Sequence, residues 1–301
     1  MHEAVSAIGD WYSANNNLIN TIGLNGILAL SIYVMLACGQ LSLASPGYMA
    51  VGAYTAALLT TNTGVPFPLQ ILVGMALAAA VALVLGLPLL RLRGVYLAIC
   101  TVGFVQVAYI FFNTWGPGGA GQGISGIGAV TSTWQIYLAL ALLCYLFWRL
   151  EGSALGRSFA AIRQDEEAAR SLGIDTVAHK LGAFAISGML AGLVGVFYAR
   201  LHFFIEPTDF SFDLGLNALI YVVIGGSYTF VGSPLGALLI TALPELLRPL
   251  QGATSGARAI VNGVIVLGVI LFLPGGLVDL PRALWSLARR RPRRPRGAPH
   301  P

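Results

Sequence analysis

Long apolar runs, separated by short polar or glycine-rich stretches, make up most of the chain. The runs are continuous and do not alternate with polar residues, which is typical of membrane helices and not of barrel strands. A helix of about 20 residues crosses a hydrocarbon core about 30 Å thick. The pattern therefore predicts an all-α fold, a polytopic membrane helix bundle with about nine membrane segments: Leu18–Cys38, Pro46–Thr61, Leu69–Leu90, Val95–Asn113, Trp134–Leu150, Leu181–Phe204, Leu214–Tyr228, Pro234–Leu247 and Ala259–Leu273.

The second, seventh and eighth segments are short for a crossing, and each is interrupted or bordered by glycine or proline. The first half of the chain has Ser45-Pro46-Gly47, and the second half has Ser233-Pro234 after Gly225-Gly226. Paired breaks of this kind predict an internal two-half organisation, with discontinuous helices around a translocation path. Freed backbone groups there could face a solute amine or carboxylate. The candidate path residues are small, polar or aromatic: Ser42, Ser45, Pro46, Gly47, Tyr54, Thr101, Gln106, Gly225, Gly226 and Ser227. Close helix packing at small residues is the alternative.

Composition supports integration into the membrane and argues against one class of transport mechanism, proton coupling. Hydrophobic residues make up 56% and charged residues 10%, against roughly 25% charged in a typical soluble domain. No Asp, Glu, Lys or Arg lies in the middle of a predicted span. A proton relay through the membrane needs such groups, so the chain is not expected to be a proton-coupled transporter.

The basic residues are distributed unevenly and predict the orientation. Fourteen of the 17 lie on the side that carries Arg91, Arg93, Arg149, the connector 151–180 and the tail 281–301. The positive-inside rule places that side in the cytoplasm. The chain is thus expected to be a multi-pass protein of the cell inner (plasma) membrane, with an extracytoplasmic N-terminus (1–17), a transmembrane domain (18–280) and a disordered cytoplasmic tail. Seven arginines interleaved with proline in the tail favour contact with membrane lipid over nucleic acid.

No motif for catalysis or for a bound cofactor is present. The segment Gly121-Gln-Gly-Ile-Ser-Gly126 matches the letters of a dinucleotide fingerprint, but it joins two membrane spans and does not lie in a βαβ unit. The four histidines are dispersed, and the three cysteines lie in apolar runs without metal-ligand spacing. The chain is therefore not expected to be an enzyme, to bind a metal or to hold a cofactor, and the energy for active transport must come from partner subunits.

The connector is the only long polar segment between spans, and its centre predicts a short helix. Acidic residues at Asp165–Glu167 suit the positive end of a helix dipole, and Gly173 suits a C-terminal cap. Ala168, Ala169 and Leu172 would give this helix one apolar docking face. An ordinary solvated helix with pairs such as Glu166–Arg170 explains the charges equally well.

Several motifs in order along residues 28–274 resemble the permease subunits of branched-chain amino-acid ATP-binding cassette importers, the LivM-type group. They are an early glycine-rich segment (Leu41–Thr55), a central span entry (Leu92-Arg93-Gly94-x-Tyr96 to Phe104), a loop (Gly123–Ile127), a coupling region (Gly156–Ala169) and a closing half (Gly225–Ala237, then Pro244-Glu245).

The resemblance implies that the connector helix docks on a cytoplasmic ATPase, through Asp165, Glu166, Glu167, Ala168, Ala169, Arg170, Leu172 and Gly173. It also implies a second permease subunit formed by a different chain, two ATP-binding subunits that use the ATP, and an extracytoplasmic substrate-binding protein. The expected solute is a branched-chain amino acid, with urea, short amides or aromatic carboxylates left open. An ATP-independent channel or facilitator for a small neutral solute is the alternative of a different class.

Overall fold

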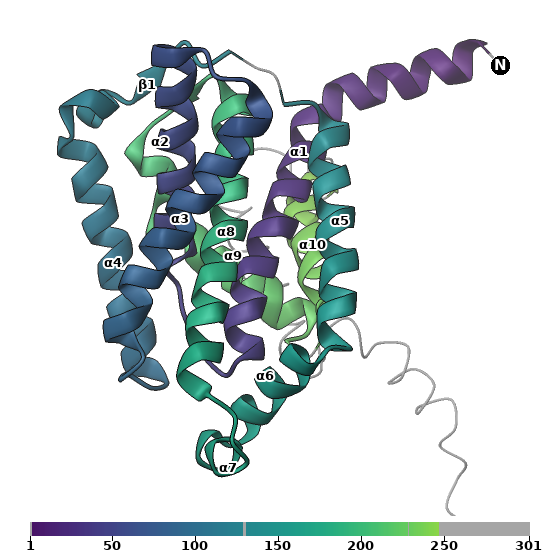
Figure 1. Ribbon diagram of the computed structural model, residues 1–301. Coiled ribbons are helices and arrows are strands. Elements are labelled where there is room, and N and C mark those ends of the chain that lie inside the picture. The colour runs from purple at the N-terminus through teal and green to yellow at the C-terminus, as the bar shows by residue number, and fades with distance from the viewer. Residues whose placement is uncertain (1, 129–130, 228, 247–301) are drawn as a thin grey trace, which may run out of the picture.

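The computed structural model describes residues 2–128, 131–227 and 229–246 and shows a helix bundle (Figure 1). Within these residues each of the first eight predicted segments contains a helix, and the ninth, Ala259–Leu273, lies outside them. The all-α polytopic bundle is thus confirmed. The helices are α1 (His2–Ala37), α2 (Ser45–Thr63), α3 (Phe67–Leu89), α4 (Val95–Thr114), α5 (Thr133–Glu151), α8 (Thr176–His202), α9 (Phe212–Gly225) and α10 (Gly232–Leu246).

Six stretches of the described chain are long and apolar enough to cross a membrane. The helix α2 is not among them, because threonine and asparagine lower the hydropathy of its last turns, and the apolar part of α10, Gly232–Leu243, is shorter. The six stretches are Asn15–Ala37, Phe67–Leu89, Val95–Thr114, Thr133–Glu151, Thr176–His202 and Pro207–Gly225.

The two ends of the bundle differ. At one end, called here the connector end, α6 (Ala154–Gln164) and α7 (Glu166–Ser171) join α5 to α8 (Figure 1). At the opposite end the loop after α4 forms the short 3-10 helices η1 (Gly116–Gly118) and η2 (Ala120–Gln122). There β1 (Ile124–Ser125) pairs antiparallel with β2 (Phe204–Ile205), which precedes η3 (Pro207–Phe210). The residues of the GxGxxG match therefore lie in η2 and an antiparallel two-residue strand, and this is not a dinucleotide-binding unit.

Several helix boundaries differ from the sequence-based prediction. The helix α1 begins at His2 and so extends beyond the predicted segment Leu18–Cys38, because polar residues alone do not end a helix and the first proline of the chain is Pro46. Its membrane-spanning part, Asn15–Ala37, agrees with the predicted segment. The helix α8 begins at Thr176, five residues before the predicted span, because the Asp175 side chain accepts a hydrogen bond from the Ala178 N–H and caps its N-terminus. The helix α6 was not predicted.

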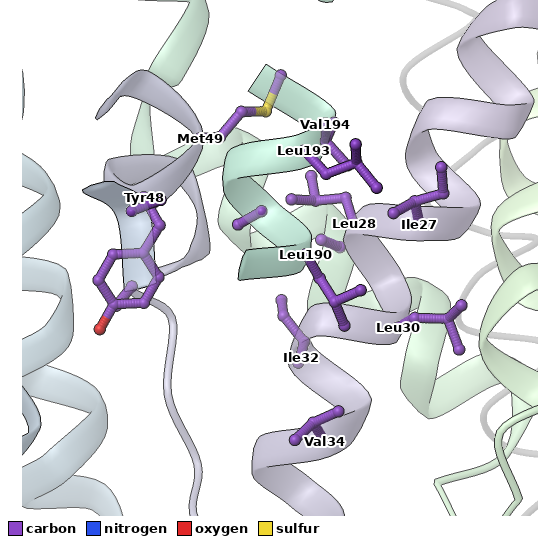
Figure 2. Packing of buried hydrophobic residues seen from close by; sticks show 14 of the residues in the cluster. Ile27, Leu28, Leu30, Ile32, Val34, Tyr48, Met49, Leu190, Leu193 and Val194 are labelled. Atoms are coloured by element: carbon purple, nitrogen blue, oxygen red, sulfur yellow. The ribbon is translucent and has the colours of Figure 1, made fainter. Parts of the chain in front are cut away.

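The centre of the bundle is α8, which packs against α1, α2 and α3. Contact with α2 and α3 is made through small residues: a side chain on Gly52 would collide with the Gly192 carbonyl group, and Gly188 and Gly192 face alanines of α3. Close approach of this kind stabilises helix packing in lipid, where burial of apolar surface contributes little. Larger apolar residues of α1, α2 and α8 fill the rest of the core (Figure 2).

The outward faces of α3, α4 and α5 are apolar and exposed, as expected for surfaces that face lipid or another subunit. They include Leu72, Val84, Ile99, Val107, Leu138 and Leu142. The apolar runs led us to expect buried cysteines, and this was right for Cys38 only, because Cys100 lies on the exposed side of α4 and Cys144 is half-buried.

We expect Gly52→Ala to lower the melting temperature of the protein purified in detergent. The added methyl group would meet the backbone of Gly192, and overpacking of this kind costs about 1–3 kcal/mol. The matched control is Gly103→Ala in α4, where nothing lies within 4 Å of the new methyl group. That variant should keep or slightly raise the melting temperature, since alanine favours a helix over glycine. Equal melting temperatures for the two variants would contradict the proposed packing.

Candidate functional site

The short helix α7 in the connector is formed by local capping interactions. The Asp165 carboxylate accepts hydrogen bonds from the backbone N–H groups of Glu167 (2.9 Å) and Ala168 (3.1 Å). The chain leaves the helix at Gly173, which has a φ of +85° that favours glycine. The predicted helix with acidic first turn and glycine cap is confirmed.

Glu166 fixes α7 to the bundle. Its carboxylate lies 2.8 Å from Lys180 Nζ, 3.5 Å from Arg93 Nε and 3.3 Å from Arg170 Nη2. Lys180 belongs to α8 and its side chain is only 7% exposed, and Arg93 belongs to the turn between α3 and α4. One carboxylate therefore joins the connector to two parts of the transmembrane bundle.

The pKa of the Glu166 carboxyl group lies below its ordinary value. Burial acts to raise this pKa, but the hydrogen bond from Lys180 and the positive charges of Lys180, Arg93 and Arg170 outweigh it. Glu166 is therefore ionised at neutral pH, and its negative charge is what holds the three basic side chains around it.

The outer surface of α7 differs from the predicted docking face. Ala168 is exposed and Leu172 is 80% exposed, whereas Ala169 is buried at 2% exposure. Residues four apart share one side of a helix, and the next residue is turned away by about 100°. Ala168 and Leu172 thus present a small apolar surface beside the exposed, charged Glu167. Ala169 packs against the bundle.

The first helix break brings together most of the predicted path residues of the first half. The Ser31 hydroxyl donates to Ser45 Oγ (3.0 Å), and Thr101 Oγ1 accepts from the Leu43 N–H (3.0 Å). All of these polar groups are buried, as is Ser42. The path residues Pro46 and Gly47 follow at the start of α2, where Gly47 packs directly on the Phe104 ring.

Two other predicted path residues lie apart from this cluster. Tyr54 is nearly two turns further along α2, buried and stacked on Phe112 at 4.2 Å between ring centroids. Gln106 is exposed on α4 beside a cavity of about 200 Å³ at η3. Thr101 is buried and Gln106 is not, so the structure does not bring these two together.

The second break is held by the connector. Gly225 ends α9, and Gly226 has a φ of +113°. Arg163 of α6 donates hydrogen bonds to the Ser227 carbonyl oxygen (2.9 Å) and to Ser227 Oγ (3.3 Å). The same residue lies against Gly39, in the segment between α1 and α2 that leads into the first break. A Cβ atom on Gly39 would be 3.0 Å from Arg163 Cα. Arg163 therefore contacts both breaks.

Glu151, at the end of α5, makes a second contact with the same loop. Its Oε1 accepts from the Tyr33 hydroxyl (2.7 Å) and from the Phe230 N–H (3.0 Å). Glu151 and Arg163 line one cavity of about 380 Å³ between α1, α5 and α6. Sequence reasoning did not select Glu151, Arg163 or Lys180 as site residues, although Lys180 is the only lysine of the chain and lies at the border of an apolar run.

Among the described residues, no three side chains of His, Cys, Asp or Glu gather as ligands for a metal ion would. The polar groups of the site instead bind backbone groups and one another.

Comparison with known proteins relates this arrangement to membrane permeases. Residues 16–273 match the family described as "Branched-chain amino acid transport system / permease component". The chain is 33% identical over 306 residues to the high-affinity branched-chain amino acid transport system permease protein LivM of Escherichia coli (strain K12), covering 90% of this chain and 69% of that protein. The LivM protein of Salmonella typhimurium (strain LT2) is 32% identical over a similar length, again 69% of that protein.

A more distant relative matches a part of the chain only. It is the autoinducer 2 import system permease protein LsrC of Yersinia pseudotuberculosis serotype O:1b (strain IP 31758), which is 32% identical over 142 residues, 45% of this chain and 40% of that protein. No solved structure matches the chain significantly.

We expect Glu166→Gln to destabilise the folded protein at neutral pH but not at acid pH. Because the folded-state pKa of Glu166 is lowered, its ion pairs stabilise the fold above the ordinary carboxyl pKa. That stabilisation is lost as the pH falls through the folded-state pKa. Melting temperatures of wild type and variant, measured across this pH range, should therefore converge on acidification.

The matched control is Glu167→Gln. Its carboxylate is 83% exposed and lies 3.9 Å from Arg93, so its removal should change the melting temperature little. A difference between wild type and Glu166→Gln that persists unchanged at acid pH would show that the charge of Glu166 is not what holds the helix.

Proposed function

This chain belongs to the family of branched-chain amino acid transport system permease components, and we propose that it is the permease subunit of an ATP-driven importer for branched-chain amino acids. Its family is one of transport permeases and not of enzymes. The observation that carries the proposal is the contact of one connector residue, Arg163, with both helix breaks.

The proposed topology is that of a cell inner membrane protein with nine segments in two halves. The connector and the C-terminal tail lie in the cytoplasm and the N-terminus lies outside. The charge distribution supports this orientation, because Arg93, Arg163, Arg170 and Lys180 gather at the connector end. The end with β1 and β2 then faces the extracytoplasmic side.

The proposed assembly has one further permease subunit of a different chain, two cytoplasmic ATP-binding subunits and a soluble extracytoplasmic binding protein. This chain binds no cofactor, and the ATP is used by the partner subunits. The exposed apolar faces of α3, α4 and α5 supply surface for lipid and for the second permease.

The coupling step begins at the surface of α7. Leu172, Ala168 and Glu167 are exposed there and would dock on an ATPase. Glu166 transfers movement of α7 to α8 through Lys180 and to the α3–α4 turn through Arg93. An ATPase can shift the permease between two states only if it contacts α7 differently in each.

Movement then reaches the path through α6. The helix α6 ends next to the N-cap Asp165 of α7, so the two helices move together. Arg163 would pull on Ser227 in the second break and press on Gly39 in the first. The two breaks would thereby change together, which is what alternating access between two packings of the spans requires.

The names of the relatives support the solute class. LivM is named for branched-chain amino acid transport and LsrC for autoinducer 2 import, and the longer and more complete match is to LivM. Urea, short amides and other small solutes are the alternatives, and their ability to compete with leucine uptake distinguishes them. Uptake that persists without ATP hydrolysis would instead favour a facilitator.

We expect Leu172→Asp to weaken association with the ATP-binding subunits and to abolish uptake of leucine. Leu172 is 80% exposed, so the fold should be unaffected. Loss of a leucine from a buried contact costs about 1.5–3 kcal/mol, which is a change of tenfold or more in affinity. Co-purification of the ATPases from membranes and uptake of radiolabelled leucine measure the two effects.

The control at the same position is Leu172→Met, which keeps an apolar side chain of similar size and should retain both association and uptake. Loss of association with full retention of uptake in Leu172→Asp would overturn the importer proposal in favour of a facilitator.

We expect Arg163→Ala to uncouple ATP hydrolysis from uptake while the complex still assembles. The variant loses the two hydrogen bonds to Ser227, so α6 can no longer move the second break. The ratio of ATP hydrolysed to leucine imported in proteoliposomes should rise. Arg157→Ala on the same helix, where the guanidinium group binds the Gly152 carbonyl within the connector, should leave the ratio unchanged. An unchanged ratio in both variants would remove Arg163 from the coupling route.

A further inference from the structure

A cavity of about 300 Å³ lies inside the opposite end of the bundle, between α1, α2, α8, η3 and α9. Its volume is at the lower limit of sites for small molecules. None of the path residues predicted from sequence lines it. It is also separate from the cavity beside Glu151 and Arg163 at the connector end.

The inner part of the cavity is apolar. It is formed by Leu28 of α1, Met49 of α2 and Val194 of α8, three side chains in the central cluster shown in Figure 2. Each of these residues is at most 3% exposed. Such a lining favours a compact aliphatic group of a solute.

The outer part of the cavity is polar. Thr21 lies seven residues before Leu28 on α1, and His202 lies eight residues after Val194 on α8. At a rise of 1.5 Å per residue these polar groups lie about 10–12 Å nearer the opposite end than the apolar part. Asp209 of η3 completes this side.

Both ionisable side chains at the polar part are held in position. Asp209 Oδ2 accepts a hydrogen bond from the Glu206 N–H (3.0 Å), and the His202 ring stacks on Tyr198 at 4.2 Å. His202 Nδ1 lies 3.2 Å from the Tyr198 carbonyl oxygen. A carbonyl oxygen can only accept, so Nδ1 is the donor in this contact. The Asp209 carboxylate favours a solute with an ammonium group.

We propose that this cavity binds an aliphatic α-amino acid inside the permease subunit, with the side chain between Leu28, Met49 and Val194 and the ammonium group at Asp209. The proposal rests on the proposed import of branched-chain amino acids and assigns a site for the solute within this chain. It is the site that receives the amino acid at the extracytoplasmic end of the path.

The inner wall of the cavity connects it to the second break. Tyr221 of α9 lines the cavity, and Asn25 Nδ2 donates to the Tyr221 hydroxyl (3.4 Å) and to Thr241 Oγ1 of α10 (3.0 Å). Gly236 of α10 packs directly on the Tyr221 carbonyl group. Tyr221 precedes Gly225 by one helical turn, so a solute in the cavity contacts the same helix pair whose connector end is held by Arg163.

Equilibrium binding of radiolabelled L-leucine to the complete importer in nanodiscs, without the binding protein, tests the site. Val194→Phe fills the apolar part and should abolish measurable binding. The matched control is Val223→Phe, the same change at a 47% exposed position of α9, which should bind leucine like wild type.

Asp209→Asn tests the ammonium contact independently and keeps an oxygen that can accept from the Glu206 N–H. It should weaken leucine binding by about tenfold, the effect of one charge-assisted hydrogen bond. The compound 4-methylpentanoate has the leucine skeleton without the ammonium group. It should compete with leucine for the Asp209→Asn variant at least as well as it does for wild type. If the importer that carries Val194→Phe does not assemble, leucine binding by the Asp209→Asn variant alone tests the site.

Leucine uptake with the binding protein present separates the two proposals. If wild type imports leucine but Val194→Phe and Asp209→Asn bind it as well as Val223→Phe does, the cavity holds water only and the site is overturned, while the proposed function stands. If the wild-type importer does not import leucine, both are overturned.

Discussion

The close packing of α8 against α2 and α3 is the contact on which the rest of the structure depends. It is made where glycine and alanine let backbones touch, at Gly52, Gly188 and Gly192. In lipid such contacts replace the hydrophobic driving force that holds soluble cores together. A helix packed in this way moves as a rigid element. Its second turn carries Lys180, which binds the connector helix, and its later turns carry Val194 and His202, which line the inner cavity.

The ion pairs of the described chain lie at the connector end, and their arrangement fixes position more than it adds stability. A partly buried carboxylate such as Glu166 pays a desolvation cost that three basic neighbours offset. What the network provides is one defined place for α7, a helix of six residues that could not persist in water alone. The exposed Leu172 is thus presented on a fixed support.

Local sequence patterns were sufficient for most of the helices and insufficient for the contacts between them. The apolar runs predicted α1–α5, α8, α9 and α10, and the acidic residues Asp165–Glu167 with Gly173 predicted α7, because these signals act over a few residues. They did not reveal that Arg163 would bind Ser227, 64 residues away. They also assigned Ala169 to an outer face that it does not occupy, since the side of a short helix that faces the bundle is set by tertiary packing.

The inner cavity was beyond sequence reasoning for a related reason. Its lining comes from five elements, each of which contributes between one and four residues. On each helix alone, Leu28, Met49 or Val194 is an ordinary core residue, and nothing in its neighbours distinguishes it. Only the packing of the helices leaves space between them.

The hydrogen bonds of the second break relate its structure to its role. A break between α9 and α10 frees backbone groups that lipid cannot satisfy, and each unsatisfied group costs several kcal/mol. Here the connector supplies partners: Arg163 binds the Ser227 carbonyl oxygen and Glu151 accepts from the Phe230 N–H. The connector therefore stabilises the break through these hydrogen bonds. A connector that moves must carry the break with it or leave polar groups unpaired, so the interactions that make the break tolerable also tie it to α6 and α7.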